Sequence, residues 1–339
     1  MAREVSVGER LDQFDVTELI ARSGMASIFK AIDLKNGNTT VALKVPYMQF
    51  ESDVVFYERF RREEQIGQRL DHPNIIKVLK PARKSRMYLA MEYFEGTSLR
   101  ALMRDKQPFE PARALNFARQ ICDALVYMHA QGVVHRDLKP ENILVGSNEQ
   151  IKIMDFGIAL DESARRLTWA GLSTTVGTPD YMAPEQVGGR RGDARTDVYA
   201  LGTILYEMLT GNLPYSGANV YATMKAKASE DPPRLTEFVP DIDLGLEEIV
   251  LHAIERVPRN RYDSAAELLE DLKDPSRVTH TGRAARLQPP NLRARRLWRS
   301  LVTGAFFLSL LAIFILVMWL ANRFPAAPPS GSTQSHGTK

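Results

Sequence analysis

Cysteine is nearly absent from this sequence, since Cys122 is the single one among 339 residues. One thiol excludes an intramolecular disulfide and a metal cluster held by several cysteines. Cys122 lies in a stretch whose apolar residues recur at helical spacing, where a free cysteine is typically a small core residue. We therefore predict that Cys122 is buried in the core.

The amino-terminal end lacks an apolar segment. The chain opens with Met-Ala-Arg-Glu and continues into charged residues, so no secretory signal peptide is expected. The other end lacks acidic residues: the last is Asp274, and nine of the 44 basic residues lie beyond it. Residues 1–274 therefore hold 35 basic against 41 acidic residues, a net charge of −6. This mildly acidic part does not suggest nucleic-acid binding, so no nucleic-acid partner is expected.

The pattern of apolar residues divides residues 1–274 into two parts. The runs 28–33 and 39–45 are β-branched or apolar, and the Asn-Gly-Asn between them is typical of a hairpin turn. Residues 53–70 have the composition of a helix that ends before Pro73. Beyond Gly96 the chain is mostly helical, with an apolar face at 3.6-residue spacing. A small β-rich part followed by a larger α-rich part predicts an α+β protein of two lobes.

One long run, residues 301–321, contains no charged residue. As a helix it would be about 31 Å long, which matches the hydrocarbon core of a bilayer. Residues 283–300, directly before this run, contain six arginines. The positive-inside rule therefore places the amino-terminal side of the run in the cytoplasm. We expect a basic juxtamembrane linker at 275–299, a single transmembrane helix in the lipid bilayer at 301–321, and a short extracytoplasmic tail at 322–339. A small-residue pair, Ala305 and Ser309, allows a homodimer through this helix.

Four short motifs follow one another along the chain. Val-Ala-Leu-Lys ends at Lys44, and His-Arg-Asp-Leu-Lys-Pro-Glu-Asn starts at His135. Asp-Phe-Gly then starts at Asp155, and Ala-Pro-Glu starts at Ala183. Each motif alone arises often by chance, but their joint order and spacing resemble the signature set of protein kinases.

The resemblance covers residues 11–272 and implies a two-lobed protein-kinase fold. It implies a catalytic domain at 11–274, with a small β-rich N-lobe at 11–93 and a large α-rich C-lobe at 97–274. The Asp-Leu-Lys-Pro-Glu-Asn segment is similar to that of serine/threonine kinases, and the Gly-Met-Ala at 24–26 is similar to bacterial ones. The implied function is ATP-dependent transfer of the γ-phosphate to serine or threonine hydroxyls of protein substrates, in membrane-associated signalling.

Phosphoryl transfer depends on positioning and on neutralising negative charge. The resemblance implies that Lys44 pairs with the α- and β-phosphates of ATP. A carboxylate must hold that lysine, and Glu63 is the first choice, with Glu64 as the alternative. Asp137 is implied to orient the attacking hydroxyl, and Lys139 to lie beside the transferred phosphate.

The resemblance also implies a nucleotide and metal site. Asn142 and Asp155 supply oxygen ligands for Mg²⁺, with Mn²⁺ as an alternative ion. The segment 91–94 resembles the hinge, where the Glu92 carbonyl and the Phe94 amide hold the edge of adenine. The residues implied to contact the nucleotide are Ile20, Ala21, Ser23, Gly24, Ile28, Ala42, Lys44, Glu92, Phe94 and Leu144.

The loop that covers the phosphates departs from the family pattern Gly-x-Gly-x-x-Gly. Ala21, Ser23 and Ala26 replace the three signature glycines, and only the extra Gly24 remains. β-Carbons restrict the torsions that glycine allows, so we expect a weaker grip on the phosphates and slower turnover or a raised nucleotide KM. The departure leaves an alternative open: a pseudokinase scaffold or nucleotide-binding module that transfers no phosphate.

Regulation is expected in the segment between Asp155 and Glu185. Arg136 precedes the catalytic aspartate and pairs, by resemblance, with a phosphate introduced into this segment by autophosphorylation. The hydroxyls implied to receive that phosphate or to line the acceptor site are Ser173, Thr174, Thr175 and Thr178. Asp197 and the pair of Glu185 with Arg261 are expected to support the large lobe structurally.

Overall fold

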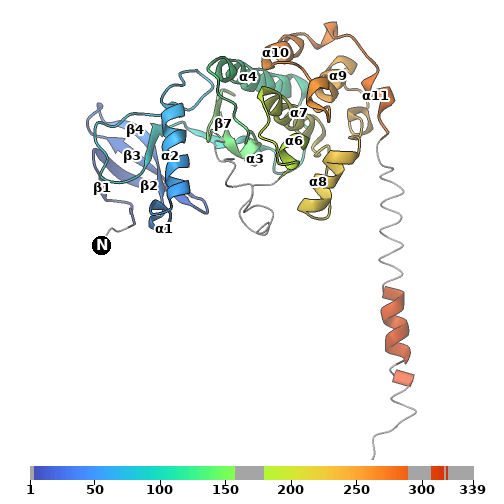
Figure 1. The fold of residues 1–339 in the computed structure, drawn as a ribbon, viewed down its shortest axis with the longest axis horizontal. Coiled ribbons are helices and arrows are strands. Elements are labelled where there is room, and N and C mark those ends of the chain that lie inside the picture. The colour runs from blue at the N-terminus through green and yellow to red at the C-terminus, as the bar shows by residue number, and fades with distance from the viewer. Residues whose placement is uncertain (1–3, 157–178, 289–306, 317, 320–339) are drawn as a thin grey trace, which may run out of the picture. The chain divides into compact units, whose positions relative to one another are not determined.

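The computed structural model describes residues 4–156, 179–288, 307–316 and 318–319. The chain divides into two compact units, Met1–Gln288 and Pro289–Lys339. The first unit has a β-rich lobe followed by a helical lobe (Figure 1). This agrees with the expected two-lobed α+β architecture.

The small lobe is built on a five-stranded antiparallel sheet with strand order β1-β2-β3-β4-β5. The predicted hairpin is present. Strands β3 and β4 are paired, and Asp33 opposite Thr39 is the last pair before the turn. In the turn, Gly37 and Asn38 take the positive φ angles that it needs. The elements are β1 (Arg10–Leu11), β2 (Phe14–Arg22), β3 (Ala26–Asp33), β4 (Thr39–Pro46), β5 (Leu89–Glu92), α1 (Met48–Glu51) and α2 (Val54–Gly67).

One face of this sheet forms a compact apolar core. Residues alternate between buried and partly exposed along β3, as expected for a strand with one covered face. Asp53 caps the amino-terminal end of helix α2: its side chain accepts hydrogen bonds from the amide N–H groups of Val55 and Phe56. The core residues of this lobe include Phe14, Val16, Phe29, Leu43 and Tyr88.

The large lobe is mainly helical. A short three-stranded sheet lies on it with strand order β6-β7-β8, and Figure 1 shows the helices gathered on the other side of the molecule from the β1–β5 sheet. The strands are β6 (Gly96–Ser98), β7 (Ile143–Gly146) and β8 (Ile151–Ile153). The helices are α3 (Leu99–Leu102), α4 (Pro111–Ala130), α6 (Pro184–Val187), α7 (Ala194–Thr210), α8 (Val220–Ser229), α9 (Leu244–Ala253), α10 (Ala265–Lys273) and α11 (Arg283–Arg286), with 3₁₀ turns at Pro140–Asn142, Leu235–Glu237, Pro258–Asn260 and Pro275–Arg277.

Helices α4 and α7 form the centre of the large lobe. Helix α4 starts with Pro111 at its first turn, and Gly132 follows its end with φ of 71°. Its apolar face is buried as predicted, and Cys122 on that face is fully buried, with Sγ 3.1 Å from the Ala265 carbonyl. Helix α7 is buried on nearly all sides. The backbone of residues 135–136, described below, is hydrogen-bonded to Asp197 of α7.

The first part of the predicted linker packs on the large lobe. Arg283 Nη1 lies 2.7 Å from Glu248 Oε1, and the Thr281 hydroxyl donates to the same oxygen. The Gln288 amide donates to Asp231 at 3.0 Å. Residues 275–288 are therefore part of the folded unit rather than a free linker. Sequence composition missed this because the contacts are made by a few apolar and charged side chains inside a basic, proline-containing segment.

The second unit contains the predicted membrane span, of which the structure describes a part. Residues 307–316 are helical, while 301–306, 317 and 320–321 lie outside the described residues, as does the predicted tail at 322–339. Within the ranges that the structure describes, no helix has both the length and the apolar character to cross a membrane. The expected transmembrane helix is thus not found among the described residues.

Candidate active site

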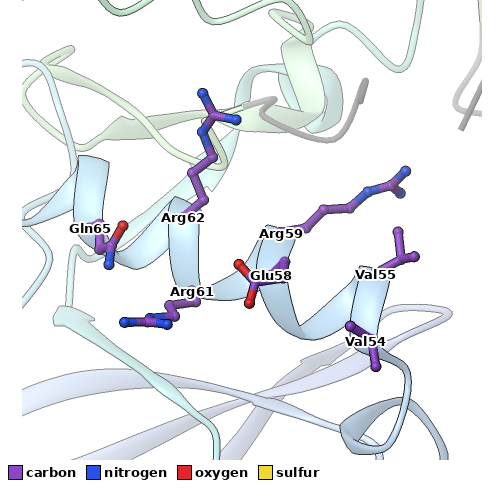
Figure 2. A pocket seen from close by; sticks show the side chains of 7 residues that line it. All are labelled: Val54, Val55, Glu58, Arg59, Arg61, Arg62 and Gln65. Atoms are coloured by element: carbon purple, nitrogen blue, oxygen red, sulfur yellow. The ribbon is translucent and has the colours of Figure 1, made fainter. Parts of the chain in front are cut away.

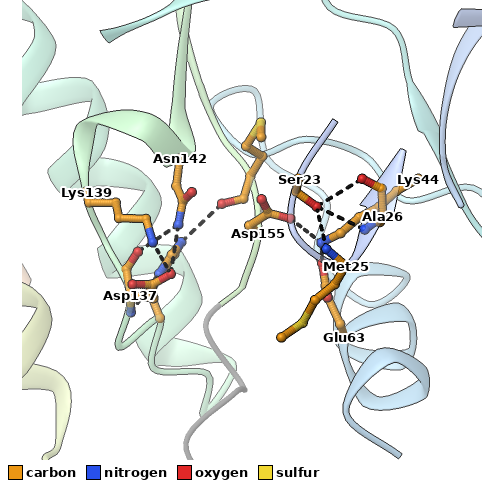
Figure 3. A network of polar contacts seen from close by, with 11 residues as sticks. Ser23, Met25, Ala26, Lys44, Glu63, Asp137, Lys139, Asn142 and Asp155 are labelled. Carbon is orange, nitrogen blue, oxygen red and sulfur yellow. Dashed lines mark hydrogen bonds and ion pairs between the residues drawn. The ribbon is translucent and has the colours of Figure 1, made fainter. Parts of the chain in front are cut away.

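Lys44 lies between two carboxylates. Its Nζ, on β4, donates to Glu63 Oε1 at 2.9 Å and to Asp155 Oδ1 at 2.6 Å (Figure 3). Glu63 belongs to α2 and Asp155 to the large lobe, so the lysine joins three segments that are far apart in sequence. Glu64, the alternative partner, pairs instead with Lys84. The structure therefore places Glu63 beside Lys44.

The electrostatics of this trio keep the lysine charged. Burial by itself disfavours the ammonium, but the Asp155 and Glu63 carboxylates outweigh burial and hold the pKa of Lys44 well above its usual value. Burial would also raise the pKa of Asp155, yet Lys44 outweighs it and lowers that pKa. Burial, together with nearby Asp155, raises the pKa of Glu63 despite Lys44. Lys44 is thus a fixed positive charge between the lobes.

The backbone beside the site adopts an uncommon conformation at two residues. Asp155 has φ of 57° and Arg136 has φ of 64°, in the left-handed region that residues with a β-carbon seldom occupy. Each such residue costs about 1 kcal/mol or more unless its surroundings fix it. The bonds of Asp155 to Lys44 and of Arg136 to Asp197 supply that fixation.

Asp137, Lys139 and Asn142 form a second group next to the trio (Figure 3). Lys139 Nζ donates to Asp137 Oδ2 at 2.8 Å, and Asn142 Nδ2 donates to the same oxygen at 3.2 Å. Asn142 Nδ2 also donates to the Asp137 carbonyl at 2.9 Å, which fixes the 3₁₀ turn at Pro140–Asn142. The Asp137 carboxylate is 44% exposed, so it is accessible to a second substrate.

A fully buried carboxylate, that of Asp197, supports the main chain just before Asp137. Asp197 in α7 accepts the backbone N–H of His135 at 2.9 Å and that of Arg136 at 2.8 Å. His129 Nε2 lies 2.8 Å from the same carboxylate. Asp197 therefore has the supporting role expected of it, because its bonds orient the main chain immediately before Asp137.

The turn between β2 and β3 is held by Ser23. The Ser23 Oγ accepts the Ala26 amide at 3.1 Å and the Met25 amide at 3.4 Å, and it lies 3.0 Å from the Ala26 carbonyl. The Tyr47 hydroxyl donates to the Ser23 carbonyl at 3.1 Å. Gly24 does not have a positive φ angle, nor does any residue from 20 to 28. The replacements of the signature glycines are therefore accommodated without backbone strain.

Several of the residues expected around adenine lie on neighbouring strands of the small-lobe sheet. Ile28 pairs with Lys44 across β3 and β4, and Ala21 pairs with Ile28 across β2 and β3. Ala42 lies opposite Met91, one residue before Glu92. The Glu92 side chain accepts the Lys77 amide N–H and a hydrogen bond from Lys152 Nζ. The remaining residues expected here are Ile20, which is exposed, and Leu144 and Phe94, which are partly buried.

Arg136 precedes Asp137 and is affected by the charges of two exposed arginines, Arg191 and Arg62. Burial, with help from Arg191 and Arg62, lowers the pKa of Arg136, and the Asp197 carboxylate only partly offsets this. Among the residues that the structure describes, the buried Arg136 Nε has no hydrogen-bond partner. Figure 2 shows Arg62 and Arg59 extending from α2 beside a pocket that this helix lines. The group is suited to an anion, because a negative charge would relieve the repulsion.

Sequence reasoning did not identify every residue of this region. Arg62 and Arg191 were missed, although the position of Arg62 directly before Glu63 on the same helix was a usable signal. Lys227, described below, was also missed and gave no signal beyond a lysine in a helical segment. Ser173, Thr174, Thr175 and Thr178 lie outside the described residues.

Comparison with known proteins gives consistent matches. Residues 14–272 match the family described as protein kinase domain. A probable serine/threonine-protein kinase of Corynebacterium efficiens is 37% identical over 286 residues, which cover 81% of this chain and 43% of that protein. The serine/threonine-protein kinase PknB of Mycolicibacterium smegmatis is 38% identical over 271 residues, covering 77% and 42%. The chain thus spans less than half the length of these curated relatives.

The solved structures agree with the sequence matches. The kinase domain of PknI from Mycobacterium tuberculosis superposes with a TM-score of 0.63 at 25% identity, and the match covers 81% of this chain and all of that domain. A structure of Rad53 in complex with AMP-PNP superposes with a TM-score of 0.60 at 26% identity, covering 76% of this chain and 64% of that one.

Proposed function

Because the chain belongs to the protein kinase family, we propose that it transfers the γ-phosphate of ATP to serine or threonine hydroxyls of proteins. The observation that carries this proposal is the pair of assembled groups. Lys44 lies between Glu63 and Asp155, and Asp137 lies beside Lys139 and Asn142. Together they offer positive charge for phosphates and a carboxylate for the acceptor hydroxyl.

In this proposal each side chain has a distinct task. Lys44 holds the nucleotide phosphates, and Glu63 keeps the lysine in place. Asp137 accepts a hydrogen bond from the acceptor hydroxyl and takes its proton as the phosphoryl group moves. Lys139, 2.8 Å from that carboxylate, neutralises charge that develops on the transferred group.

The donor set also fits Mg²⁺, and Mn²⁺ as an alternative. Asp155 offers a carboxylate, and Asn142 offers an amide oxygen whose orientation is fixed because its nitrogen is bonded to Asp137. Both are hard oxygen donors of the kind these ions prefer. When bound, the ion would supply charge neutralisation of the phosphates. In this proposal Asn142 and Asp155 would hold it.

We further propose that the chain is regulated by a phosphate on Ser173, Thr174 or Thr175. Arg136, Arg62 and Arg191 support this, since their mutual repulsion leaves a site for an anion. The membrane anchor also remains a proposal. Residues 301–321 would span the bilayer once, with the kinase domain in the cytoplasm and the tail outside, and pairs of spans would allow a homodimer. The uncharged composition of the span and the helix at 307–316 support it.

The decisive experiment compares the full chain with its Asp137→Asn variant, using radiolabelled ATP with Mg²⁺ and a generic protein acceptor. We expect the wild type to incorporate phosphate on serine and threonine, with sites mapped among Ser173, Thr174 and Thr175, and the variant to incorporate none. Nucleotide binding without phosphate incorporation by the wild type would instead favour the pseudokinase. The altered phosphate loop is the one feature that supports that alternative.

A further inference from the structure

Lys227 is an unusual residue of helix α8. It is fully buried, with no exposed surface. An isolated buried ammonium is costly, so a buried lysine normally requires strong partners. Its matched neighbour on the same helix, Lys225, is exposed. An apolar residue at position 227 would fill the core at lower cost, which suggests that the amine has a specific task.

The partners of Lys227 are main-chain carbonyls of one short segment. Its Nζ donates to the carbonyl of Met182 at 2.8 Å and to the carbonyl of Asp180. The Nζ also lies 5.3 Å from the centre of the Tyr199 ring, in the geometry of a cation–π contact. Lys227 of α8 is therefore hydrogen-bonded to the first and the last residue of the tripeptide Asp180–Met182.

The same tripeptide is linked through Arg100 to the segment that carries Asp137. The Tyr181 hydroxyl bonds to Glu207 and to Arg100. Arg100 Nε in turn donates to Glu141 at 2.8 Å, one residue before Asn142. A second link runs from Gln186 Nε2 to the Arg136 carbonyl at 2.9 Å. Residues 180–182 thus lie between α8 and the loop that carries Asp137.

We propose that Lys227 is a positioning residue for the protein acceptor. By fixing the carbonyls of Asp180 and Met182, it keeps the surface of this segment in register with Asp137, so that an acceptor peptide docks with its hydroxyl near that carboxylate. This inference rests on the proposed kinase function. It concerns acceptor binding alone, because the hydrogen bonds of Lys227 go to Asp180 and Met182, neither of which is expected to hold the nucleotide.

The protonation of Lys227 gives an independent readout. Burial lowers the pKa of Lys227 to about 7, and the nearby Asp180 carboxyl acts against burial. The other ionisable groups around it are Asp180, whose pKa is raised by its own burial, Tyr199 in α7, and Arg261, which stacks on the same Tyr199 ring and pairs with Glu185. The ammonium forms stronger hydrogen bonds to the two carbonyls than the neutral amine does. These two hydrogen bonds therefore weaken as pH rises through 7.

The test measures KM for a protein acceptor (dephosphorylated casein) and KM for ATP separately, with the full chain. Lys227→Met should raise the acceptor KM about tenfold, the effect of losing one charge-assisted hydrogen bond, and should leave the ATP KM unchanged. The matched control Lys225→Met should change neither. Equal acceptor KM values for Lys227→Met and wild type would overturn the proposal. So would a parallel change of both KM values with a lower melting temperature, because that indicates a merely structural role.

The wild-type pH profile needs no variant and decides the case if Lys227→Met fails to fold. Between pH 6 and 8.5 the acceptor KM should rise while the ATP KM stays flat, and Asp180→Asn, which keeps its main-chain carbonyl, should retain this rise. A flat acceptor profile overturns the role of Lys227 while phosphate transfer itself stands. If the wild type transfers no phosphate at all, the proposed function fails first and the positioning role fails with it.

Discussion

Ser23 shows how one side chain alters the loop that covers the phosphates. Its hydroxyl accepts two amide N–H groups, those of Met25 and Ala26. These two bonds fix the direction of both amide groups and hold the turn in one conformation. The serine therefore orders the turn that is expected to cover the phosphates.

We predict that Ser23→Ala loosens the turn and weakens nucleotide binding. The loss of hydrogen bonds worth about 1 kcal/mol should change the Kd for an ATP analogue roughly fivefold. Isothermal titration calorimetry measures this change directly. Thr17→Ala is the control. The hydroxyl of Thr17, on β2, also forms a hydrogen bond to a carbonyl, that of Lys30 on β3, but it lies away from the turn. Tighter binding by Ser23→Ala would show instead that the serine competes with the phosphates.

At the scale of elements, a buried ion pair joins α6 to the end of the large lobe. Arg261 Nη2 lies 2.7 Å from Glu185 Oε2, and both side chains are almost wholly buried. Thr196 at the start of α7 donates to the same carboxylate at 3.0 Å. Burial would raise the pKa of Glu185, but Arg261 outweighs it and the pKa falls below its ordinary value of 4.5.

We predict that Glu185→Gln destabilises the protein by about 3 kcal/mol at pH 7, because it leaves the Arg261 charge buried and unpaired. The folded-state pKa of Glu185 is depressed, so its contribution is complete above pH 4.5 and is lost as pH falls further. Thermal melts from pH 7 to pH 3 should therefore show a wild-type advantage that shrinks below pH 4.5. Glu149→Gln, in an exposed pair with Arg113, should change stability by less than about 1 kcal/mol. A difference that stays constant with pH would contradict the pairing.

Elements with strong local signals could be predicted from the sequence. The hairpin of β3 and β4 carries Asn-Gly-Asn at its turn, and α4 has Pro111 at its start and a regular apolar face. The pairing of Lys44 with Glu63 could be predicted only through the resemblance to a kinase, because Glu63 and Glu64 are adjacent in the sequence and either could have been the partner. Contacts such as Lys227 with the Asp180 carbonyl could not be predicted, because their partners are main-chain atoms brought together only by the tertiary fold.

At the scale of the whole molecule, the folded unit extends beyond the family match. That match ends at residue 272, whereas packed residues continue to Gln288. Val278, Ala284 and Leu287 pack against the large-lobe core. Arg283 adds ion pairs to Glu248 at 2.7 Å and to Glu255 at 3.5 Å.

We predict that a chain ending at Asp274 melts at least about 2 °C below a chain ending at Gln288, as expected for the loss of one or more kcal/mol from a domain of this size. Arg283→Ala in the longer chain should lower its melting temperature by part of that difference, because it removes the ion pairs and keeps the apolar contacts. Arg277→Ala is the control, since that side chain is 85% exposed. Equal melting temperatures for the two chain lengths would show that the docked segment adds no stability.

The buried thiol of Cys122 makes the chain convenient for spectroscopy. Burial raises the pKa of Cys122 and keeps it from solvent, and only an accessible thiolate reacts with maleimides. Because the sequence has no second cysteine, one cysteine introduced on the surface would accept a fluorophore or spin label at a single site, with Cys122 left in place. Pairs of such probes, one on α2 and one on α8, would follow the opening and closing of the two lobes without a cysteine-free background.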